Sequence, residues 1–185
     1  MTSDRSLAGN IVTLRGNSIE LKTLEPSDMH VGYIEGLNDP KVNKFLVGVK
    51  LCRQTKENLT EFVKQSLESN SEILFGIWCD DQDKFCGTVR LHGIEYTHKT
   101  GHIGICLFNP KIWGKGIGKE AIVAVTKWAL KELDLRWIEA GAYNDNIGSN
   151  RLFLAAGYEK MYQVRGKFLL DGEPVDVTIY AARNG

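Results

Sequence analysis

The chain has 185 residues, of which 43% are hydrophobic and 25% are charged, so it is long and apolar enough for a substantial core. Lys plus Arg and Asp plus Glu each total 23, which leaves no net charge to attract nucleic acid or an anionic membrane. Residues 1–10 lack the apolar stretch of a secretory signal, and no run is long enough to span a membrane. We therefore expect a single domain over residues 1–185, located in the cytoplasm, with neither a nucleic acid nor a membrane as partner.

The N-terminal third of the chain reads as a hairpin followed by helices. Residues 11–15 and 18–22 alternate apolar and polar side chains around a Gly-Asn turn, which predicts two paired strands at a sheet edge. Pro26 and the two polar residues after it are typical of a helix start, and the pattern predicts a helix to about Leu37. Three segments follow: a short helix over 40–46, a connector over 47–53 and a helix over 55–68.

The middle of the chain reads as a meander of three strands. They cover residues 72–79, 84–94 and 101–108. The acidic turn Asp80–Asp83 lacks the central Gly and the later Glu of an EF-hand, so we expect a solvated turn rather than a calcium site. His92, His98 and His102 have no metal-ligand spacing, and we predict no metal site.

The four cysteines are Cys52, Cys79, Cys86 and Cys106. They contain no C-x-x-C pair, and the last three fall in apolar strand patterns. This distribution is typical of cytoplasmic core residues, so we predict that all four are reduced thiols.

A strand, a glycine-spaced turn and a long helix form the segment that organises the chain. Residues 103–108 are almost wholly apolar, as expected for a strand buried on both faces. Apolar residues recur at helical spacing over 117–133. Between the two lies a turn with glycines at alternate positions: Gly114, Gly116 and Gly118. A strand therefore leads into a helix through a turn with little side-chain bulk.

This turn is suited to holding an anion. Glycines allow positive φ, and the first turn of a helix carries unpaired N–H groups and a partial positive charge. A phosphate or diphosphate fits there, with Lys115 and Lys119 beside it. A P-loop needs a glycine five residues after its first one, here Gly114, and a dinucleotide fingerprint needs a glycine three residues after its second one, here Gly116. Lys119 occupies both positions, so both motifs are excluded. A plain glycine-rich connector with solvated lysines is left open on spacing alone.

The C-terminal third reads as a strand, a short helix and a closing hairpin. The strand covers 136–143, and a helix over 146–156 ends at Gly157, where a C-terminal cap is expected. Residues 158–165 and 175–182 then form the hairpin around an Asp-Gly turn.

Two motifs together resemble the GNAT N-acetyltransferases. Residues 113–118, Trp-Gly-Lys-Gly-Ile-Gly, are similar to the acetyl-CoA loop of that family, although Trp113 replaces its usual Gln or Arg. Residues 146–158 resemble the second signature, Asn-x-x-[Ala/Ser] followed by a helix that ends in Gly-[Phe/Tyr]. The pair is specific because a helix and a strand separate the two motifs. With the C-terminal tail, the likeness is greatest to the ribosomal-protein N-terminal acetyltransferases and covers nearly the whole chain.

The resemblance implies an α/β fold with a central mixed, mostly antiparallel twisted sheet of about seven strands, flanked by helices and splayed between its fourth and fifth strands. It implies direct transfer of an acetyl group from acetyl-CoA to a primary amine in a ternary complex, with no metal. The residues that it assigns to the cofactor are Cys106, Leu107, Phe108, Gly114, Lys115, Gly116, Ile117, Gly118, Lys119, Asn146, Ser149 and Arg151.

The catalytic assignments combine the resemblance with strand geometry. In many family members a tyrosine seven residues after the motif Asn acts as the general acid, but here Phe153 occupies that position. Ser149 is the candidate acid in the branch that the chain resembles, although a Ser near a helix start is often only a cap. Glu139 and Tyr143 share one face of a strand, and Glu139 is the preferred base. His102 and a water chain are open alternatives.

The acceptor is read from weaker signals. The segment 37–46 resembles relatives associated with amino sugars and surface polysaccharides, and the neutral charge offers no ribosome-facing basic surface, so an amino sugar is preferred. By the same resemblance, residues 43–46 are candidate acceptor contacts, although a structural lid is the preferred interpretation for each of them individually. A protein N-terminus is the alternative acceptor, and a non-catalytic acyl-CoA sensor is the alternative class, suggested by Phe153. A homodimer is left open.

Overall fold

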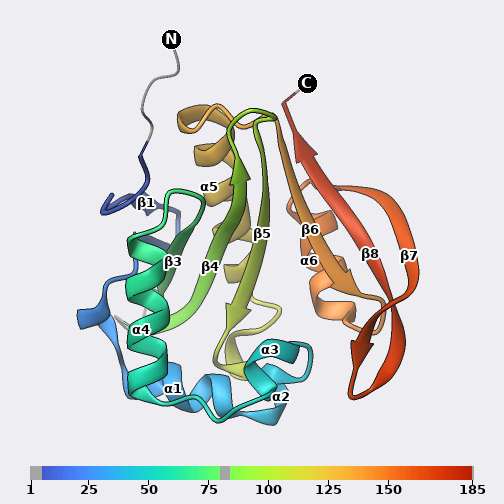
Figure 1. The fold of residues 1–185 in the computed structure, drawn as a ribbon, viewed down its shortest axis with the longest axis horizontal. Helices are drawn as coiled ribbons and strands as arrows, with labels where there is room; N and C mark the ends of the chain where they lie inside the picture. Colours follow the sequence, from blue (N-terminus) through green and yellow to red (C-terminus); the bar gives the residue numbers. More distant parts are fainter. Residues whose placement is uncertain (1–5, 80–83, 185) are drawn as a thin grey trace.

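The computed structural model describes residues 6–79 and 84–184, whose eight strands form one sheet in the order β1-β2-β3-β4-β5-β6-β8-β7 (Figure 1). Only β5 and β6 are parallel; all other neighbours are antiparallel. The predicted mixed, mostly antiparallel sheet is confirmed, with eight strands because the opening hairpin contributes two. The bounds are β1 (Thr13–Arg15), β2 (Ile19–Thr23), β3 (Ile73–Cys79), β4 (Lys84–Glu95), β5 (Thr100–Leu107), β6 (Trp137–Tyr143), β7 (Glu159–Leu170) and β8 (Glu173–Arg183).

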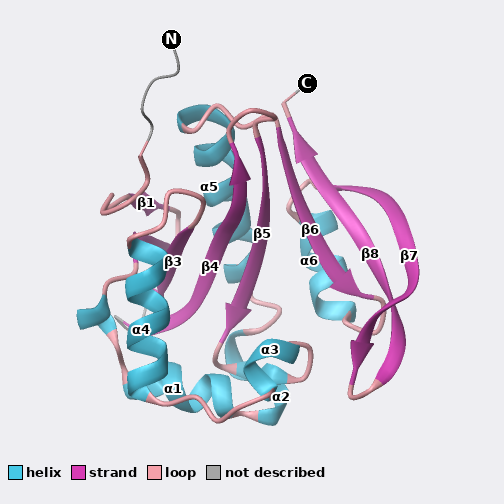
Figure 2. Ribbon diagram, viewed as in Figure 1, coloured by secondary structure: helices cyan, strands magenta, loops and turns pink. Residues whose placement is uncertain are grey.

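The helices pack on both faces of the sheet (Figure 2). Helix α5 contacts β2, β4 and β5, and α6 contacts β6, β7 and β8 on the same face, whereas α1 and α4 contact β4 and β3 on the opposite face. The bounds are η1 (Pro26–Asp28), α1 (Val31–Asn38), α2 (Pro40–Asn43), α3 (Val47–Lys50), α4 (Lys56–Leu67), η2 (Pro110–Ile112), α5 (Ile117–Glu132) and α6 (Ile147–Ala155).

Some predicted bounds differ from the structure: the helix predicted over 40–46 ends at Asn43, and the strand predicted over 158–165 continues to Leu170. Two further segments differ in kind. The helix expected from Pro26 is split into η1 and α1, because Asp28 accepts a hydrogen bond from the Glu25 N–H at 2.8 Å and Met29 then becomes extended. His30 caps α1 through its Nδ1, which accepts from the Gly32 N–H at 3.0 Å. The second difference is α3, which lies inside the predicted connector.

The sheet and α5 share the larger of two apolar clusters. The stripe predicted on α5 is fully buried at Ala121, Ile122, Val125 and Ala129, and burying a side chain such as Ile122 contributes about 1.5–3 kcal/mol. A smaller cluster lies under α1 and α4, where the Tyr33 ring stacks on Phe108 at 4.6 Å. The larger cluster packs against one face of β5 through Ile103, Ile105 and Leu107, and the smaller one contacts the other face through Cys106 and Phe108. Strand β5 is therefore held on both faces and gives the site a fixed frame.

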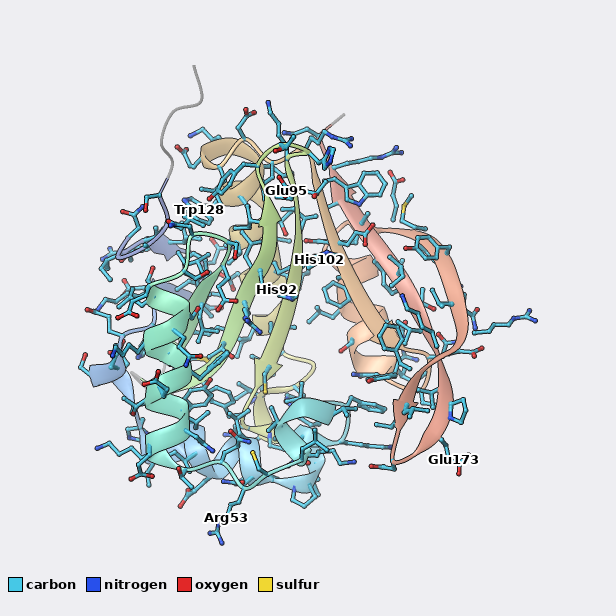
Figure 3. All side chains as sticks on the ribbon, in the orientation of Figure 1. Arg53, His92, Glu95, His102, Trp128 and Glu173 are labelled. Carbon is cyan, nitrogen blue, oxygen red and sulfur yellow. A yellow bond between two sulfur atoms is a disulfide. The ribbon has the colours of Figure 1, made fainter. Side chains whose placement is uncertain are left out.

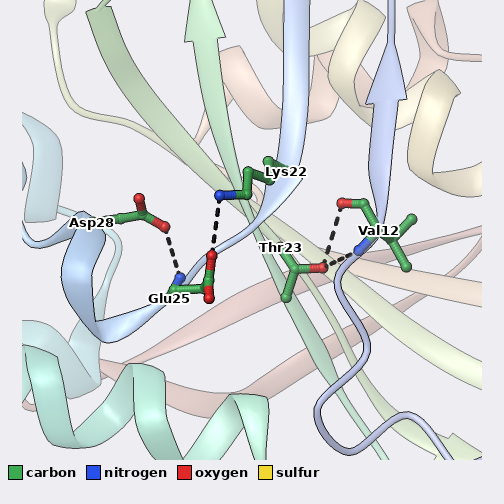
Figure 4. A network of polar contacts seen from close by, with 5 residues as sticks. All are labelled: Val12, Lys22, Thr23, Glu25 and Asp28. Atoms are coloured by element: carbon green, nitrogen blue, oxygen red, sulfur yellow. Dashed lines mark hydrogen bonds and ion pairs between the residues drawn. The ribbon is translucent and has the colours of Figure 1, made fainter.

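A short polar network secures the outer edge of the sheet (Figure 4). Thr23 Oγ1 at the end of β2 accepts from the Val12 N–H at 2.9 Å, and Lys22 Nζ lies 3.0 Å from Glu25 Oε2. The same Glu25 begins η1, so the network connects the opening hairpin to the first helical turn.

The prediction for the cysteines is wrong at two positions. Cys79 and Cys86 form a disulfide across the β3–β4 hairpin, since pairing of these strands brings their Cα atoms to 6.6 Å. Cys52 is a free thiol but is exposed. Cys106 is a free thiol in β5, and burial raises its pKa to about 12. The predicted turn at 80–83 lies outside the described residues.

Strands β5 and β6 pair over a short stretch and then separate. Their parallel register covers only the pairs Thr100↔Trp137, Gly101↔Ile138 and His102↔Glu139. Figure 2 shows the two strands diverging below this point. We call the unpaired stretch, residues 103–107 of β5 and 140–143 of β6, the splay, and the His102↔Glu139 pair its head. The splay predicted between these strands is confirmed.

Candidate active site

The loop between β5 and α5 is held open by left-handed glycines. Gly114 and Gly116 have φ of 75° and 88°, and Gly116 is the residue before the first turn of α5. Trp113 lies against the end of β5, where its indole Nε1 donates to the Leu107 carbonyl at 3.2 Å. Since the loop is tied to the strand by this bond, its amides have a fixed position at the wide end of the splay.

All but one of the amides over residues 114–119 lack an acceptor within the described part of the chain. The Lys115 N–H reaches the Ile112 carbonyl only at 3.4 Å, and the remaining N–H groups have no hydrogen bond there. They belong to Gly114, Gly116, Ile117, Gly118 and Lys119. Unpaired amides at the start of a 16-residue helix can bind an anion. The side chains of Lys115 and Lys119 are exposed and can approach it.

Gly118 serves packing rather than loop shape. A Cβ at this position would lie 2.5 Å from Leu152 Cδ1 on α6, so the missing side chain lets α5 and α6 approach each other. The two motifs are therefore in contact at the wide end of the splay.

The main chain of β5 offers fewer groups to the splay than the sequence predicts. The Phe108 N–H already donates to the Cys86 carbonyl at 2.9 Å, and Cys106 is opposite Thr88 in the same antiparallel ladder. Successive residues of a strand direct their main-chain groups to opposite edges. Of the three predicted residues, Leu107 is thus the one whose main chain faces the splay. Ile105, which the sequence analysis did not single out, faces it too.

Helix α6 carries the second motif. Asn146 Oδ1 accepts from the Ser149 N–H at 3.1 Å, so Asn146 caps the helix. The partly buried Ser149 hydroxyl has no hydrogen-bond partner among the described residues. Arg151 is exposed on the next turn. The cap thus belongs to Asn146, and the Ser149 hydroxyl is free for another role.

Two neighbours of Ser149 have structural roles. Asn150 Nδ2 donates to the Tyr143 and Asn146 carbonyls at 2.9 and 2.8 Å, and its Oδ1 accepts from the Tyr180 hydroxyl at 2.7 Å. Asn150 therefore joins α6 to β6 and β8, a role that the sequence analysis missed. Phe153 is only 3% exposed and stacks on Tyr180 at 5.9 Å, so this position is part of the core.

The head of the splay carries a polar cluster on the face opposite α5. Glu139 Oε1 accepts from Trp137 Nε1 at 3.0 Å, and its Oε2 lies 4.0 Å from His102 Nδ1. A cavity of about 360 Å³ adjoins them, lined by Thr100, Gly101, His102, Arg136, Trp137 and Glu139. Figure 3 shows His102 and its neighbour His92 over the middle of the sheet, where no helix covers them in that view. The predicted base Glu139 therefore lies beside an imidazole.

The far end of β6 is bridged by the α2–α3 region. Phe45 stacks on Tyr143 with ring centroids 6.0 Å apart, and Lys50 Nζ forms an ion pair with Asp171 at the tip of the β7–β8 hairpin, at 2.5 Å. A second cavity, of about 310 Å³, is lined by Tyr143, Asn144, Asp145, Leu170, Pro174, Val175 and Asp176. Tyr143 and Glu139 are four residues apart on one strand, roughly 13 Å, so the two cannot act on the same atom.

None of the helices in the described ranges combines the length and the apolar character that crossing a bilayer requires. No group of three or more His, Cys, Asp or Glu side chains within residues 6–79 and 84–184 is placed to hold a metal ion.

Comparison with known sequences identifies relatives. A family model described as an acetyltransferase (GNAT) domain matches residues 18–159. The probable N-acetyltransferase YjcK of Bacillus subtilis (strain 168) is 35% identical over 130 residues, which are 70% of this chain and 71% of YjcK. The uncharacterized N-acetyltransferase YoaA of the same organism is 31% identical over 109 residues, and this match spans 59% of the chain and 61% of YoaA.

Solved structures resemble the fold over almost its full length. The ribosomal-protein-S5-alanine acetyltransferase from Vibrio fischeri has a TM-score of 0.76 at 22% identity and matches 94% of this chain and 97% of its own. The spermidine N-acetyltransferase from Vibrio cholerae, solved with CoA and spermine, has a TM-score of 0.76 at 19% identity over 90% of this chain and 95% of its own. At these identities the likeness establishes the fold alone. The family match over residues 18–159, together with the glycine loop and the splay, shows that the chain belongs to the GNAT acetyltransferase family, the acetyl-CoA-dependent acyltransferases that the paired motifs predict.

Proposed function

We propose that the chain transfers the acetyl group of acetyl-CoA directly to a primary amine. One observation supports the binding of acetyl-CoA: main-chain amides without hydrogen-bond partners lie beside left-handed glycines at the start of α5. They would hold the diphosphate of CoA. The pantetheine arm would then run along the main chain of Leu107 and Ile105, and the thioester would point toward the head of the splay.

The chemistry requires an acceptor of protons and a donor. An ammonium group cannot attack a thioester, so it must first lose a proton. Attack then forms a C–N bond, and collapse of the tetrahedral intermediate breaks the C–S bond. We assign Ser149 as the donor to the departing thiolate, because its hydroxyl is free and its helix packs on the start of α5. No step of this direct transfer needs a metal.

We further propose an amino sugar as the acceptor. The cavity at the head of the splay combines an aromatic side chain, Trp137, with the carboxylate of Glu139 and the cation Arg136. An aromatic face can pack against a sugar ring, and a carboxylate accepts hydrogen bonds from its hydroxyls. The absence of net charge also gives no preference for a basic or acidic protein partner. A protein N-terminus is the second candidate, because the Vibrio fischeri neighbour is a ribosomal-protein-S5-alanine acetyltransferase.

A panel of amines tests these proposals. Thiol release from acetyl-CoA is measured with nucleotide-linked amino sugars, peptides with free N-termini and polyamines, and CoA binding is measured separately. Release with amino sugars alone supports the proposed acceptor, whereas release with peptides supports the second candidate. Binding of CoA without release for any amine would favour a sensor and overturn the catalytic proposal.

A further inference from the structure

The head of the splay brings two residues together that are far apart in sequence. His102 is the last residue of β5 that pairs with β6, and Glu139 is its partner. Their side chains are 53% and 27% exposed and both line the larger cavity. A ligand in this cavity would therefore meet His102 where the two strands begin to separate.

A chain of polar contacts orients the imidazole. Trp137 Nε1 donates to one oxygen of Glu139, which fixes the carboxylate, and the other oxygen faces His102 Nδ1 at 4.0 Å. On the β4 side, Gly93 leaves room for the imidazole ring, because a Cβ at this position would lie 3.1 Å from His102 Cδ2. Nδ1 is thus directed to the carboxylate, and Nε2 has no hydrogen bond among the described residues.

The charges around His102 favour one protonated imidazole and not two. The ring of His92 stacks on His102 at 5.7 Å, and burial lowers its pKa, as do the charges of Arg90 and His102. Arg90 is itself paired with Glu72, and Arg136 lines the cavity. Glu139 is the carboxylate that faces His102 directly, so it is the group that would stabilise a positive charge there.

We infer that His102 accepts the proton that the acceptor ammonium loses, with Glu139 as its positioning residue. The inference rests on the proposed acetyl transfer. The first proton passes from the ammonium nitrogen to Nε2 of His102 and then to solvent. The second leaves the nitrogen when the C–N bond is complete; as the C–S bond breaks, Ser149 donates its hydroxyl proton to the sulfur of CoA and takes up this second proton, so that its hydroxyl is restored.

Two physical reasons favour the imidazole over the carboxylate as the base. A general base works best when its conjugate acid has a pKa near the operating pH, and imidazoles as a class titrate near 6.5, roughly two units above carboxylates. In addition, Glu139 already accepts a hydrogen bond from Trp137, so it is committed to holding the pair in place.

The test compares kcat/KM for the best-reacting amine of the panel as a function of pH in four variants. For His102→Gln we expect a loss of about 10²-fold or more at pH 8. The ratio of wild type to His102→Gln cancels the ionisation of the amine itself, and it should fall toward one in the acid range, because an imidazolium cannot accept a proton. Added imidazole should restore part of the rate of His102→Ala. His98→Gln, the same change at an exposed turn, should behave as wild type.

Glu139→Gln separates positioning from packing. Without the carboxylate an imidazolium is less stable, so the midpoint of the pH dependence should move to lower pH, with a loss of roughly tenfold at pH 8. The KM for acetyl-CoA should not change in any variant. A ratio near one at every pH, or a loss that is independent of pH and that imidazole does not rescue, would overturn the inference. Absence of thiol release in the wild type would instead overturn the proposed function.

Discussion

The two ends of the splay present different chemical groups: main-chain amides at the wide end and side chains at the head. At the wide end, the binding groups are main-chain amides of consecutive residues, 114–119, and side chains contribute little shape. At the head, the groups are side chains of His102, Trp137 and Glu139, brought together by strand pairing. We therefore expect the wide end to tolerate side-chain substitutions that preserve the backbone conformation, whereas the head depends on the identity of each side chain.

Apart from the His102 variants at the head, the largest effect is expected at Ser149, the side chain proposed as the general acid. Ser149→Ala should lower kcat by about 10²-fold, the lower end of the range for general acid–base groups, because the thiolate would leave without a proton donor. Acetyl-CoA affinity should stay unchanged, since the cap of α6 is provided by Asn146. Steady-state kinetics together with CoA titration measure both. The matched variant Ser149→Thr keeps the hydroxyl and should retain most of the turnover; equal turnover in wild type and Ser149→Ala would leave Ser149 a structural residue.

The next largest effect is expected for acetyl-CoA binding at the wide end of the splay. Gly116→Val should weaken acetyl-CoA binding by about 5- to 30-fold, because a left-handed conformation costs a side-chain-bearing residue about 1–2 kcal/mol. Its φ is 88° and a Cβ would meet nothing within 4 Å, so the cost comes from the backbone alone. Isothermal titration with CoA measures the affinity.

Two controls sharpen the contrast at this end. Gly9→Val, at a φ of 73° and far from the loop in sequence, should destabilise the fold without affecting CoA binding. Lys115→Ala and Lys119→Ala should each cost only about threefold, and less at high salt, because exposed charges are screened. Larger losses for the lysines than for Gly116→Val would reverse the assignment of the diphosphate to main-chain groups.

A smaller effect is expected where α2 and α3 bridge the far end of β6. Phe45→Ala removes the stack on Tyr143, and such aromatic pairs contribute about 0.5–1.5 kcal/mol. If the acceptor extends from the head of the splay to residues 43–46, its KM should rise about threefold to tenfold at unchanged CoA affinity. Leu51→Ala is the control, because Leu51 is 81% exposed just after α3. An unchanged KM would show that residues 43–46 do not contact the acceptor.

The smallest effect concerns the stability of the fold where Glu120 of α5 is hydrogen-bonded to the opening hairpin. Burial acts to raise the pKa of Glu120, but the hydrogen bonds from Ser18 and Asn17 outweigh it and hold the pKa below its ordinary value. A lowered folded-state pKa means that the stabilisation is complete above the unfolded pKa, near 4.3, and is lost as the pH falls through the folded value.

Urea unfolding checks this prediction. Glu120→Gln should be less stable than wild type at neutral pH, and the difference should shrink as the pH falls below about 4. The exposed Glu173→Gln serves as control and should show no such convergence. Equal stability of wild type and Glu120→Gln at pH 7 would remove the link between the opening hairpin and α5.

The order of elements and the glycine loop could be predicted because they depend on local rules. Helical periodicity locates α5, and the alternate glycines mark its start without reference to any tertiary contact. The split of the first helix could not be predicted, because Glu25 with Asp28 caps η1 and His30 caps α1 only a few residues later, and only the folded geometry selects both. The disulfide was missed for a similar reason, since hairpin pairing brings Cys79 and Cys86 together.

By itself the sequence determined the order of the elements and the glycine turn, since backbone conformation there follows from glycines and from periodicity a few residues long. The family and the splayed sheet were implied by the resemblance of its two motifs to the GNAT enzymes. Only the tertiary structure decided which groups face the splay. It directed the Phe108 amide to β4, placed Phe153 in the core, and joined His102 to Glu139 across a parallel strand pair. The register between distant strands depends on the packing of the whole sheet, and no local pattern encodes it.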